Sequence, residues 1–314
     1  MQSKSENLKL TISEKTKMQL QELAKKPLEV ISLDFHLREL EGIPTEIFSF
    51  SNLRELNLKN NYLKSLPKEF ELLQNLEKLE LGGNYLKSFP EVVCSLPKLK
   101  YLDLSWNQIE NVDNCIGNLT NLEVLSLNHN EIPSLPESIG NLKKLKLLAL
   151  NNNKLKDLPK TIGNLVLLEE LYLFENELST VPEEIGNCIN LKKLELQQNQ
   201  IEELPNSIGN LLKLEKLRLY KNLLKNIPTT IGNLTNLTKL YLYENQLTEI
   251  PETIGKLINL IELDLSGNEL HSLPETIFNL KQLNKLSIEN NHFPRDYVYV
   301  LKEKLPQTNI ECDV

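Results

Sequence analysis

The chain has 314 residues, with 43 acidic against 35 basic side chains and a formal net charge of −8 at pH 7. Its hydrophobic content of 40% and charged content of 25% are typical of a chain that folds around a core, which excludes disorder by composition. No apolar run approaches the roughly 18 residues of a membrane span. The acidic balance argues against general binding to a nucleic-acid backbone.

The first segment predicts a helix that caps one end of the fold. Residues 12–26 carry apolar side chains at a helical period, namely Met18, Leu20, Leu23 and Ala24. Ser13 is suited to cap this helix, and we expect a first strand over residues 28–33. The opening residues contain no apolar core of a secretory signal, so we expect no signal peptide in this chain. A leader removed earlier would leave the same sequence, so the cellular compartment stays open.

A repeat of 23 residues then organises the chain. Asparagine recurs in step at Asn61, Asn84, Asn107, Asn130, Asn153, Asn176, Asn199, Asn222, Asn245, Asn268 and Asn291. Leucine keeps the same step from Leu56 to Leu286, and proline does so from Pro44 to Pro274, except at Asp113. An atypical first copy starts at Val30. The sequence therefore predicts twelve repeats over residues 30–294, with an unusual unit at the end, as solenoids require.

The consensus LxxLxLxxNxLxxLPxxIGNLxx predicts the structure of each repeat. The LxL part alternates inward and outward, as a short strand does. The asparagine follows the strand, and its amide can satisfy buried turn groups, so stacked copies would form an asparagine ladder. The proline starts a return path that is too short for a regular helix, which favours a 3₁₀ turn. A glycine column from Gly117 to Gly255 suggests positive φ, but Phe48 and Cys94 in that column make this requirement doubtful.

The last segment predicts a second cap, a helix over residues 294–306 followed by a strand over residues 309–312. Proline stands at the start and the stop of this helix. Val298, Leu301 and Leu305 would face the last repeat. We therefore divide the chain into an N-terminal capping region (residues 1–29), the repeats (30–294) and a C-terminal cap (295–314).

The repeated core LxxLxLxxNxL, with its LPxxIGNLxx extension, resembles the leucine-rich-repeat family over residues 30–294. The repeats are similar to those of bacterial leucine-rich-repeat proteins, and also to those of intracellular Ras-pathway scaffolds and plant Ras-group proteins. The resemblance implies an α/β repeat solenoid, a curved horseshoe. Its parallel sheet would line the concave face and 3₁₀ or short helical turns the convex face, with helical caps at both ends.

Counting the first leucine of LxxLxLxxN as position 1, the residues at positions 3, 5, 7, 8 and 10 would make the concave face. Seven of the nine tyrosines and the one tryptophan occupy these positions. The predicted partner-binding residues are Tyr62, Tyr85, Tyr101 and Trp106 in one group, and Tyr172, Phe174, Tyr220, Tyr241 and Tyr243 in a second, with Lys193, Lys216, Arg218 and Lys239 beside it. Exposed Trp, Tyr and Arg are enriched at binding hot spots. The alternative is that tyrosine simply suits a half-solvated sheet.

Position 2 alternates in sign from repeat to repeat, through Arg54, Glu77, Lys100, Glu123, Lys146, Glu169, Lys192 and Glu215. Neighbouring strands would then place opposite charges together. We interpret this column as a structural feature without a binding role. The middle repeats carry small or amide side chains, including Ser126, Ala149 and Asn151.

The cysteines and histidines do not suggest a reactive or metal site. Cys188 occupies a leucine position and predicts a small core residue. Cys94 and Cys115 lie in neighbouring repeats, but spacing alone does not set Cβ geometry, so we expect unpaired thiols while the pairing stays open. His36, His129, His271 and His292 are isolated and predict solvated surface residues, and we expect no bound metal or other cofactor.

No nucleophile elbow, phosphate-binding loop or other catalytic motif occurs, so the sequence predicts a protein that is not an enzyme. It favours a monomeric module that binds a protein partner on its concave face. By resemblance, such a protein would act at the bacterial surface or as a secreted protein, on host or matrix proteins. The alternative is an intracellular signalling scaffold, which the missing leader favours. The partner and pathway stay open.

Overall fold

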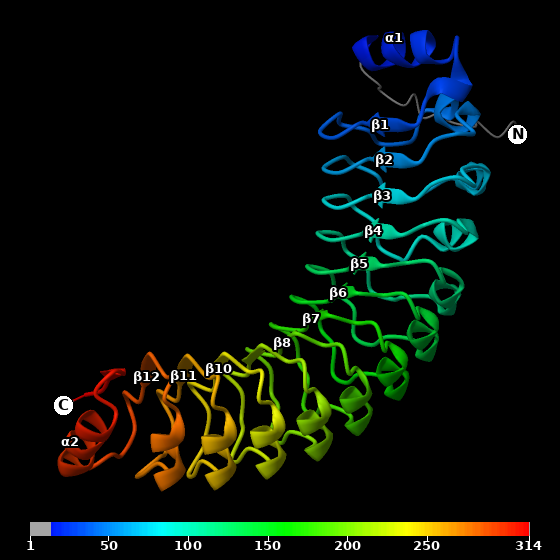
Figure 1. Cartoon of the computed structure of the whole chain (residues 1–314). Helices are drawn as coiled ribbons and strands as arrows, with labels where there is room; N and C mark the ends of the chain where they lie inside the picture. Colours follow the sequence, from blue (N-terminus) through cyan, green and yellow to red (C-terminus); the bar gives the residue numbers. More distant parts are fainter. Residues whose placement is uncertain (1–13, 314) are drawn as a thin grey trace, which may run out of the picture.

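The computed structural model describes residues 14–313, and within them the chain winds into a curved solenoid. Thirteen parallel strands form one sheet in chain order along the inner side of the arc, and 3₁₀ turns line the outer side (Figure 1). The strands are β1 Ser32–Asp34, β2 Glu55–Asn57, β3 Lys78–Glu80, β4 Tyr101–Asp103, β5 Val124–Ser126, β6 Leu147–Ala149, β7 Glu170–Tyr172, β8 Lys193–Glu195, β9 Lys216–Arg218, β10 Lys239–Tyr241, β11 Glu262–Asp264, β12 Lys285–Ser287 and β13 Asn309–Glu311. The predicted fold class is confirmed.

The convex side consists of short 3₁₀ helices, as the LPxxIGN segment predicts. They are η1 Pro27–Glu29, η2 Thr45–Ser49, η3 Lys68–Leu72, η4 Glu91–Ser95, η5 Asn114–Asn118, η6 Glu137–Asn141, η7 Lys160–Asn164, η8 Glu183–Asn187, η9 Asn206–Asn210, η10 Thr229–Asn233, η11 Glu252–Lys256 and η12 Glu275–Asn279. The isoleucine of each IGN triplet, such as Ile162 in η7, is fully buried. It closes the core from the convex side, opposite the strand leucines.

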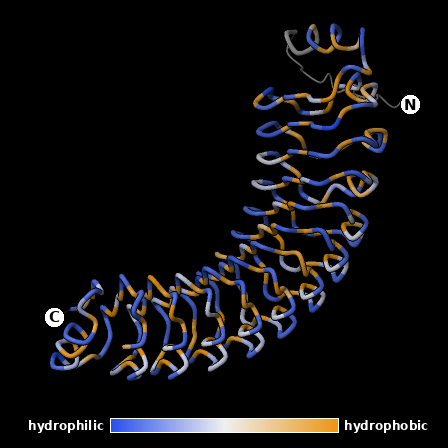
Figure 2. Tube along the Cα trace, in the orientation of Figure 1, coloured by the Kyte–Doolittle hydropathy of each residue, from blue (hydrophilic) through white to orange (hydrophobic). Residues whose placement is uncertain are grey.

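The core is a continuous stack of leucine and isoleucine side chains. The middle residue of each strand pairs with its equivalent on the next, for example Leu148 with Leu171. Both side chains are fully buried. Figure 2 shows the resulting pattern, in which apolar segments recur in every coil from one end of the arc to the other. Each coil thus buries its apolar surface only against its two neighbours.

The asparagine column forms the predicted ladder. The Asn153 side-chain oxygen accepts the Ile132 amide of the previous repeat at 3.0 Å. Its amide group donates to the carbonyls of Leu127 at 3.0 Å and Leu150 at 2.9 Å. These three backbone groups lie in the buried turn after each strand and have no partner in a regular ladder. One side chain per repeat therefore joins two coils through groups that would otherwise be unsatisfied.

A second asparagine ladder, which the sequence reasoning missed, runs just before the strands. The side-chain amide of Asn121 donates to the Pro97 carbonyl of the preceding coil at 2.7 Å. The same bond recurs at Asn52, Asn75, Asn190, Asn236 and Asn259. The NL dipeptide that precedes many strands is the sequence signal for it. Side-chain amides thus join neighbouring coils both before and after each strand.

The glycine column reflects close packing between 3₁₀ turns and not a left-handed backbone. A Cβ atom built on Gly163 would lie 2.3 Å from the Glu184 carbonyl oxygen of the next turn. Gly163 does not have positive φ, which among the described glycines occurs at Gly83 and Gly267. Gly163 and Glu184 are 21 positions apart, two fewer than the repeat length of 23. Adjacent 3₁₀ turns are therefore staggered by two residues relative to the repeat.

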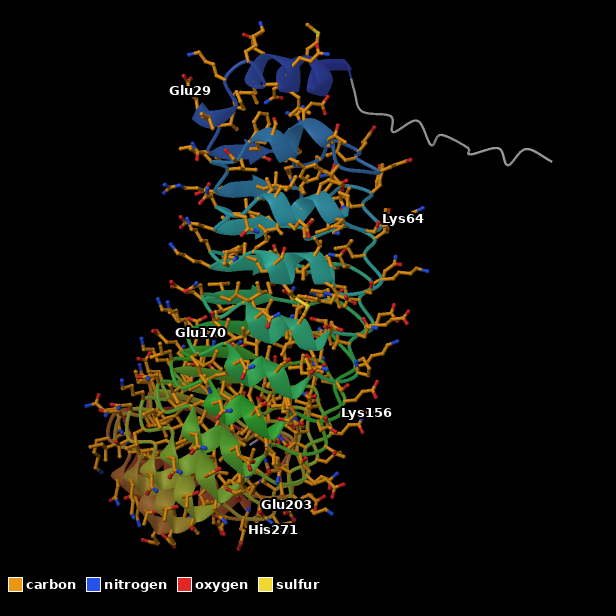
Figure 3. All side chains as sticks on the ribbon, turned by 90° about the vertical axis from the view of Figure 1, so that its right-hand side faces the viewer. Glu29, Lys64, Lys156, Glu170, Glu203 and His271 are labelled. Carbon is orange, nitrogen blue, oxygen red and sulfur yellow. A yellow bond between two sulfur atoms is a disulfide. The ribbon has the colours of Figure 1, made fainter. Side chains whose placement is uncertain are left out.

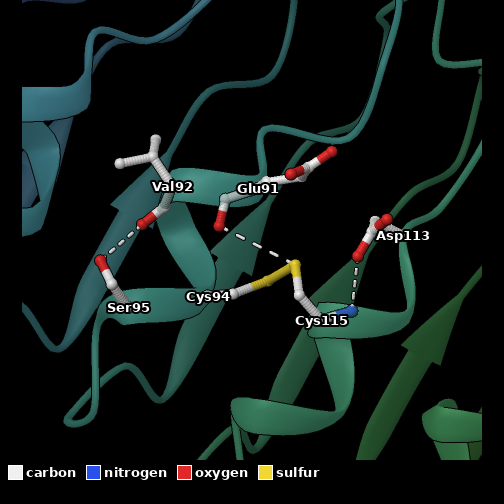
Figure 4. Close-up of a disulfide and its surroundings, with 6 residues drawn as sticks. All are labelled: Glu91, Val92, Cys94, Ser95, Asp113 and Cys115. Atoms are coloured by element: carbon white, nitrogen blue, oxygen red, sulfur yellow. Dashed lines mark hydrogen bonds between the residues drawn. A yellow bond between two sulfur atoms is a disulfide. The ribbon is translucent and has the colours of Figure 1, made fainter.

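Cys94 and Cys115 occupy this same staggered contact and form a disulfide between η4 and η5 (Figure 4). Their Cα atoms lie 5.8 Å apart, at a sequence separation of 21. The expectation of unpaired thiols was therefore wrong, because the stagger of the turns, which the sequence spacing alone does not reveal, brings the two cysteines within bonding distance. Cys188 is fully buried, as predicted, and burial raises the pKa of its thiol to about 12.

Helices cover both ends of the solenoid. At the N-terminal end, α1 (Glu14–Leu23) buries Leu20, whereas Met18 is exposed, contrary to the predicted apolar face. The proposed cap Ser13 lies outside the described residues. The chain then forms η1, which begins at Pro27, so β1 starts at Ser32 and not at residue 28.

At the C-terminal end, α2 (Arg295–Lys304) follows the last repeat. It buries Val298 and Leu301, and Leu305 directly after it is also buried. β13 then pairs with β12 and extends the sheet by one strand. Neither described end of the solenoid leaves its core open to solvent.

The asparagine ladder predicts a defined loss of stability. Asn153→Ala leaves the Ile132 amide and two carbonyls unsatisfied in a buried turn, so the free energy of unfolding should fall by roughly 1–3 kcal/mol. Urea denaturation measures this difference. The matched control is Asn164→Ala, which removes an exposed amide of η7, and its unfolding curve should match that of the wild type. Identical curves for all three proteins would contradict the structural role of the ladder.

The disulfide makes a second prediction. Replacing Cys94 and Cys115 with serine should lower the free energy of unfolding by about 3 kcal/mol, because the cross-link no longer restricts the unfolded chain. A reductant should destabilise the wild type and leave the double variant unchanged in denaturant titrations. Thiol titration of unfolded wild type should detect two more thiols with reductant than without, and equal thiol counts would exclude the disulfide.

Candidate binding face

The concave face is an array of side chains in parallel rows, one row for each outward position of the repeat. The strands cross the solenoid from one flank to the other. In Figure 3, Glu170 at the start of β7 projects from one flank, and Lys64 and Lys156, which follow the asparagine, project from the opposite flank. Residues that are equivalent in the repeat lie side by side on neighbouring strands. Adjacent side chains in a row are therefore 23 positions apart in the sequence.

The alternating charges at position 2 pair along their row, as predicted. Lys146 lies 2.7 Å from Glu123, and Lys192 lies 2.7 Å from Glu169. The hydrogen bond from each lysine holds the pKa of its glutamate below the ordinary value. These side chains are mostly exposed, so each pair contributes little to stability.

The basic residues predicted to face a partner are also paired within the sheet. Lys193 contacts Glu170 at 2.8 Å, and Lys239 contacts Glu262 at 2.7 Å. Lys216 and Arg218 share the buried Glu195, at 3.4 Å and 2.9 Å. Their charges are thus largely neutralised before any partner arrives. The row that looks basic in the sequence is a row of ion pairs in the structure.

The second aromatic group divides into two arrangements. The rings of Tyr220 and Tyr243 stack at 4.2 Å between centroids with an interplanar angle of 9°. Tyr241 lies beneath Arg218, whose guanidinium carbon is 5.7 Å from the ring centroid. The Tyr241 hydroxyl donates a hydrogen bond to Glu262. Burial and this hydrogen bond raise the pKa of Tyr241 to about 12.

The remaining members of that group, Tyr172 and Phe174, are half-buried and follow one another along a single coil. The Tyr172 hydroxyl donates to Glu170. Burial, together with that bond, raises the pKa of Tyr172 above its ordinary value. Tyr172 and Tyr241 are therefore tied into the sheet by their hydroxyls, whereas the Tyr220–Tyr243 pair is held by stacking.

The first aromatic group is spread over the face and is not one cluster. Tyr62 and Tyr85, each more than 40% exposed, stack at 6.0 Å at the flank after the asparagine. Tyr101 lies in β4, with the Lys78 ammonium 5.2 Å from its centroid. Trp106 contacts none of these three tyrosines and instead stacks on His129.

The stack of Trp106 on His129 is the feature of this face that sequence reasoning missed. The two ring centroids are 3.6 Å apart with an interplanar angle of 14°. His129 is half-buried, and this burial lowers the pKa of the imidazole, so its interpretation as a solvated residue was wrong. The sequence signal for this contact was that Trp106 and His129 both occupy position 8 and are 23 residues apart.

Position 8 also has a distinctive backbone. Trp106 and His129 both have φ of 54°, in the left-handed region, as do most equivalent residues. Glycine and asparagine tolerate this conformation, and Gly83 and Asn60 occupy it in the preceding coils. A bulky indole there is strained, and 61% of the Trp106 surface is nevertheless exposed.

The described residues contain no group of three or more His, Cys, Asp or Glu side chains able to hold a metal ion. His271 and His292 come close, with ring centroids 5.0 Å apart. Among the same residues, no helix is long and apolar enough to cross a membrane.

The repeat architecture identifies the family. The leucine-rich repeat region model matches residues 10–127 and 91–182, and further leucine-rich repeat models match residues 190–211 and 235–293. The chain therefore belongs to the leucine-rich-repeat family, whose members are generally protein-interaction scaffolds without enzymatic activity. A comparison with curated proteins finds none that matches.

Solved structures give the same fold. A leucine-rich-repeat protein of Leptospira interrogans is 28% identical with a TM-score of 0.71, covering 93% of this chain and 98% of its own. A TDR receptor is 32% identical with a TM-score of 0.78, covering 87% of this chain, which spans about half of the receptor chain (49%). A chain of the octameric complex of Latrophilin 3, Unc5D and FLRT2 is 26% identical with a TM-score of 0.72, covering 88% of each chain.

The Trp106–His129 stack predicts a coupled effect on pKa and stability. Trp106→Asn uncovers the imidazole, so the pKa of His129 should rise toward 6.5, as measured by NMR titration of the histidine ring protons. The stabilisation linked to the lowered pKa is present above pH 6.5 and is lost as the pH falls through the lowered value.

The free energy of unfolding of Trp106→Asn should stay within about 1 kcal/mol of the wild type, because relief of backbone strain offsets the lost stacking. His36→Asn, at the far end of the sheet, is the control and should leave the His129 titration unchanged. An unaltered His129 pKa in Trp106→Asn would show that the indole does not cover the imidazole.

Proposed function

We propose that this chain is a non-enzymatic module that binds a protein partner on its concave face. The observation that carries the proposal is the Tyr220–Tyr243 stack. Neither ring belongs to the core, and both lie on a face where the neighbouring basic side chains are already paired with carboxylates of this chain. Rigid, partly exposed aromatic pairs are the side chains from which binding hot spots are built.

The other aromatic residues predicted to bind a partner lie on the same face. Tyr62, Tyr85 and Trp106 are exposed toward the N-terminal end, and Tyr172 and Phe174 lie toward the middle. Between them, the side chains of Ser126 and Ala149 are short, so the sheet surface there carries no bulky group. A partner that touches both aromatic groups would span several coils, as an extended or convex protein surface would.

The Cys94–Cys115 disulfide favours action outside the cytosol. Structural disulfides persist in oxidising compartments and are rare where thiols are kept reduced. Together with the similarity to the Leptospira protein along the whole chain, this supports a bacterial surface or secreted protein that engages host or matrix proteins. It speaks against the alternative of an intracellular signalling scaffold. The helices α1 and α2 cover both ends of the stack, which supports a monomer.

Affinity capture tests this function. The immobilised wild type is compared with Tyr220→Ala/Tyr243→Ala, using extracellular matrix and serum proteins in one arm and cytosolic lysate in another. A partner should be captured from the extracellular pool, and the purified partner should bind the double variant at least about tenfold more weakly, since truncating a hot-spot residue costs about 2 kcal/mol or more and tenfold corresponds to about 1.4 kcal/mol.

The matched control is Tyr62→Ala/Tyr85→Ala, which removes a second stacked pair from a different part of the solenoid. Unfolding curves establish that both variants remain folded. Equal binding by the wild type and the Tyr220→Ala/Tyr243→Ala variant would reject the assignment of the site. Capture from the lysate alone would favour the intracellular alternative.

A further inference from the structure

The tyrosine stack is open on one side. Its two rings are parallel and come from neighbouring coils, so the stacking axis runs across the strands. Tyr220 covers one face of Tyr243. The next residue in that row is Ser266, whose side chain is too short to cover the other face. The second face of Tyr243 therefore borders a gap in the row, above Ser266.

Two carboxylates flank this gap. Asp264 precedes Ser266 on β11, and its Oδ1 atom accepts the Ser266 amide at 3.1 Å and the Ser266 hydroxyl at 2.6 Å. Glu289 is the next residue of the row and is exposed. Within the part of the chain that the structure describes, no basic side chain lies within 4.0 Å of either carboxylate. Lys285, on the neighbouring strand, pairs instead with Glu311 at 2.9 Å.

This distinguishes the gap from the rest of the C-terminal half of the face. Lys193, Lys216, Arg218 and Lys239 each have a carboxylate partner. Lys216 and Arg218 share one carboxylate, whereas Asp264 and Glu289, on the side of the open face of Tyr243, have no cation of the described residues paired with them. A complementary partner would therefore bring a cation to that side of the stack.

An arginine of this chain already makes the same kind of contact internally. The guanidinium of Arg218 lies over the ring of Tyr241 while its Nη1 atom donates to Glu195 at 2.9 Å. An arginine thus lies between an aromatic face and a carboxylate two coils away from Ser266. Tyr243 and Asp264 offer the same two elements with no arginine of this chain between them.

We propose that the gap above Ser266 receives an arginine side chain of the protein partner. The planar guanidinium stacks on the open face of Tyr243 and donates hydrogen bonds to Asp264 and Glu289. A lysine would supply charge but no planar face for stacking, and an acidic side chain would meet two carboxylates. The inference rests on the proposed function and adds the chemistry of the partner.

The test uses N-acetyl-arginine amide as the probe and the full chain with isotope-labelled tyrosine rings. NMR signals of Tyr220 and Tyr243, assigned from Tyr→Phe variants, should shift and saturate as the probe is added. N-acetyl-citrulline amide has the same planar shape without the charge and should bind about tenfold more weakly or not at all. Saturable shifts with N-acetyl-glutamate amide would reverse the sign of the partner and overturn the inference.

The decisive variant is Asp264→Asn, which keeps the oxygen that accepts the Ser266 amide and removes the charge. It should weaken binding of the arginine probe about threefold or more. Asp34→Asn is the matched control, because Asp34 stands at the same strand position and its Oδ1 atom accepts the His36 amide at 2.9 Å. That variant should bind the probe as the wild type does.

Besides binding of the glutamate probe, three results would overturn the inference: no saturable shift at Tyr243, equal affinity for the arginine and citrulline probes, or equal affinity of Asp264→Asn and the wild type. None of them bears on the capture experiment. A partner that is lost from Tyr220→Ala/Tyr243→Ala while the arginine probe fails would retain the proposed function and reject the arginine site.

Discussion

The whole structure depends on hydrogen bonds between successive coils, because no coil can satisfy its own backbone. Each strand is three residues long and pairs only with its neighbours. Beyond the strand, the chain turns while still inside the molecule, where water cannot reach the free amides and carbonyls. Asn153 and its equivalents supply the missing partners in the buried turn after each strand. Asn121 and its equivalents bond to the preceding coil in the more exposed segment before each strand. Removing such a side chain affects two coils at once.

The same constraint organises the surface. Because coils are held in register, residues 23 positions apart become neighbours, and charges pair along rows instead of facing outward. Lys239 and Glu262 show this on the concave face, and Lys146 and Glu123 show it beside the strands. A basic column in the sequence is therefore a poor guide to a basic surface. The proposed arginine site lies where a row is interrupted, at Ser266 between Tyr243 and Glu289.

The core, the sheet, the 3₁₀ turns and the asparagine ladder follow from the sequence because each depends on contacts that repeat every 23 residues. Features that depend on how the 3₁₀ turns of neighbouring coils lie against each other did not follow. The disulfide joins residues 21 apart, since the 3₁₀ turns are staggered relative to the strands, and the glycines pack at that same stagger. The start of β1 was misplaced because Pro27 begins a 3₁₀ turn where a strand was expected.

The candidate site was predictable only in part, for a related reason. Periodicity places Tyr220 and Tyr243 on one face, but it does not determine that their rings stack, or that the hydroxyl of Tyr241 is tied to Glu262. Those outcomes depend on rotamers and on the residue in the adjacent row. The partnership of Trp106 with His129 depends in addition on a left-handed backbone that no single repeat reveals.

That left-handed position shows how residues on the concave face can vary without disturbing the fold. The backbone at position 8 is set by the asparagine beside it and by hydrogen bonds to the next coil, such as the Trp106 amide to the Asn128 carbonyl at 2.9 Å. The side chain there makes no contribution to the core, so replacing glycine with tryptophan costs only about 1–2 kcal/mol of backbone strain. A stack of many coils tolerates that cost, because its stability is approximately a sum over repeats and their interfaces. A strained aromatic can therefore be carried on the concave rim for its chemistry while the neighbouring asparagines maintain the fold.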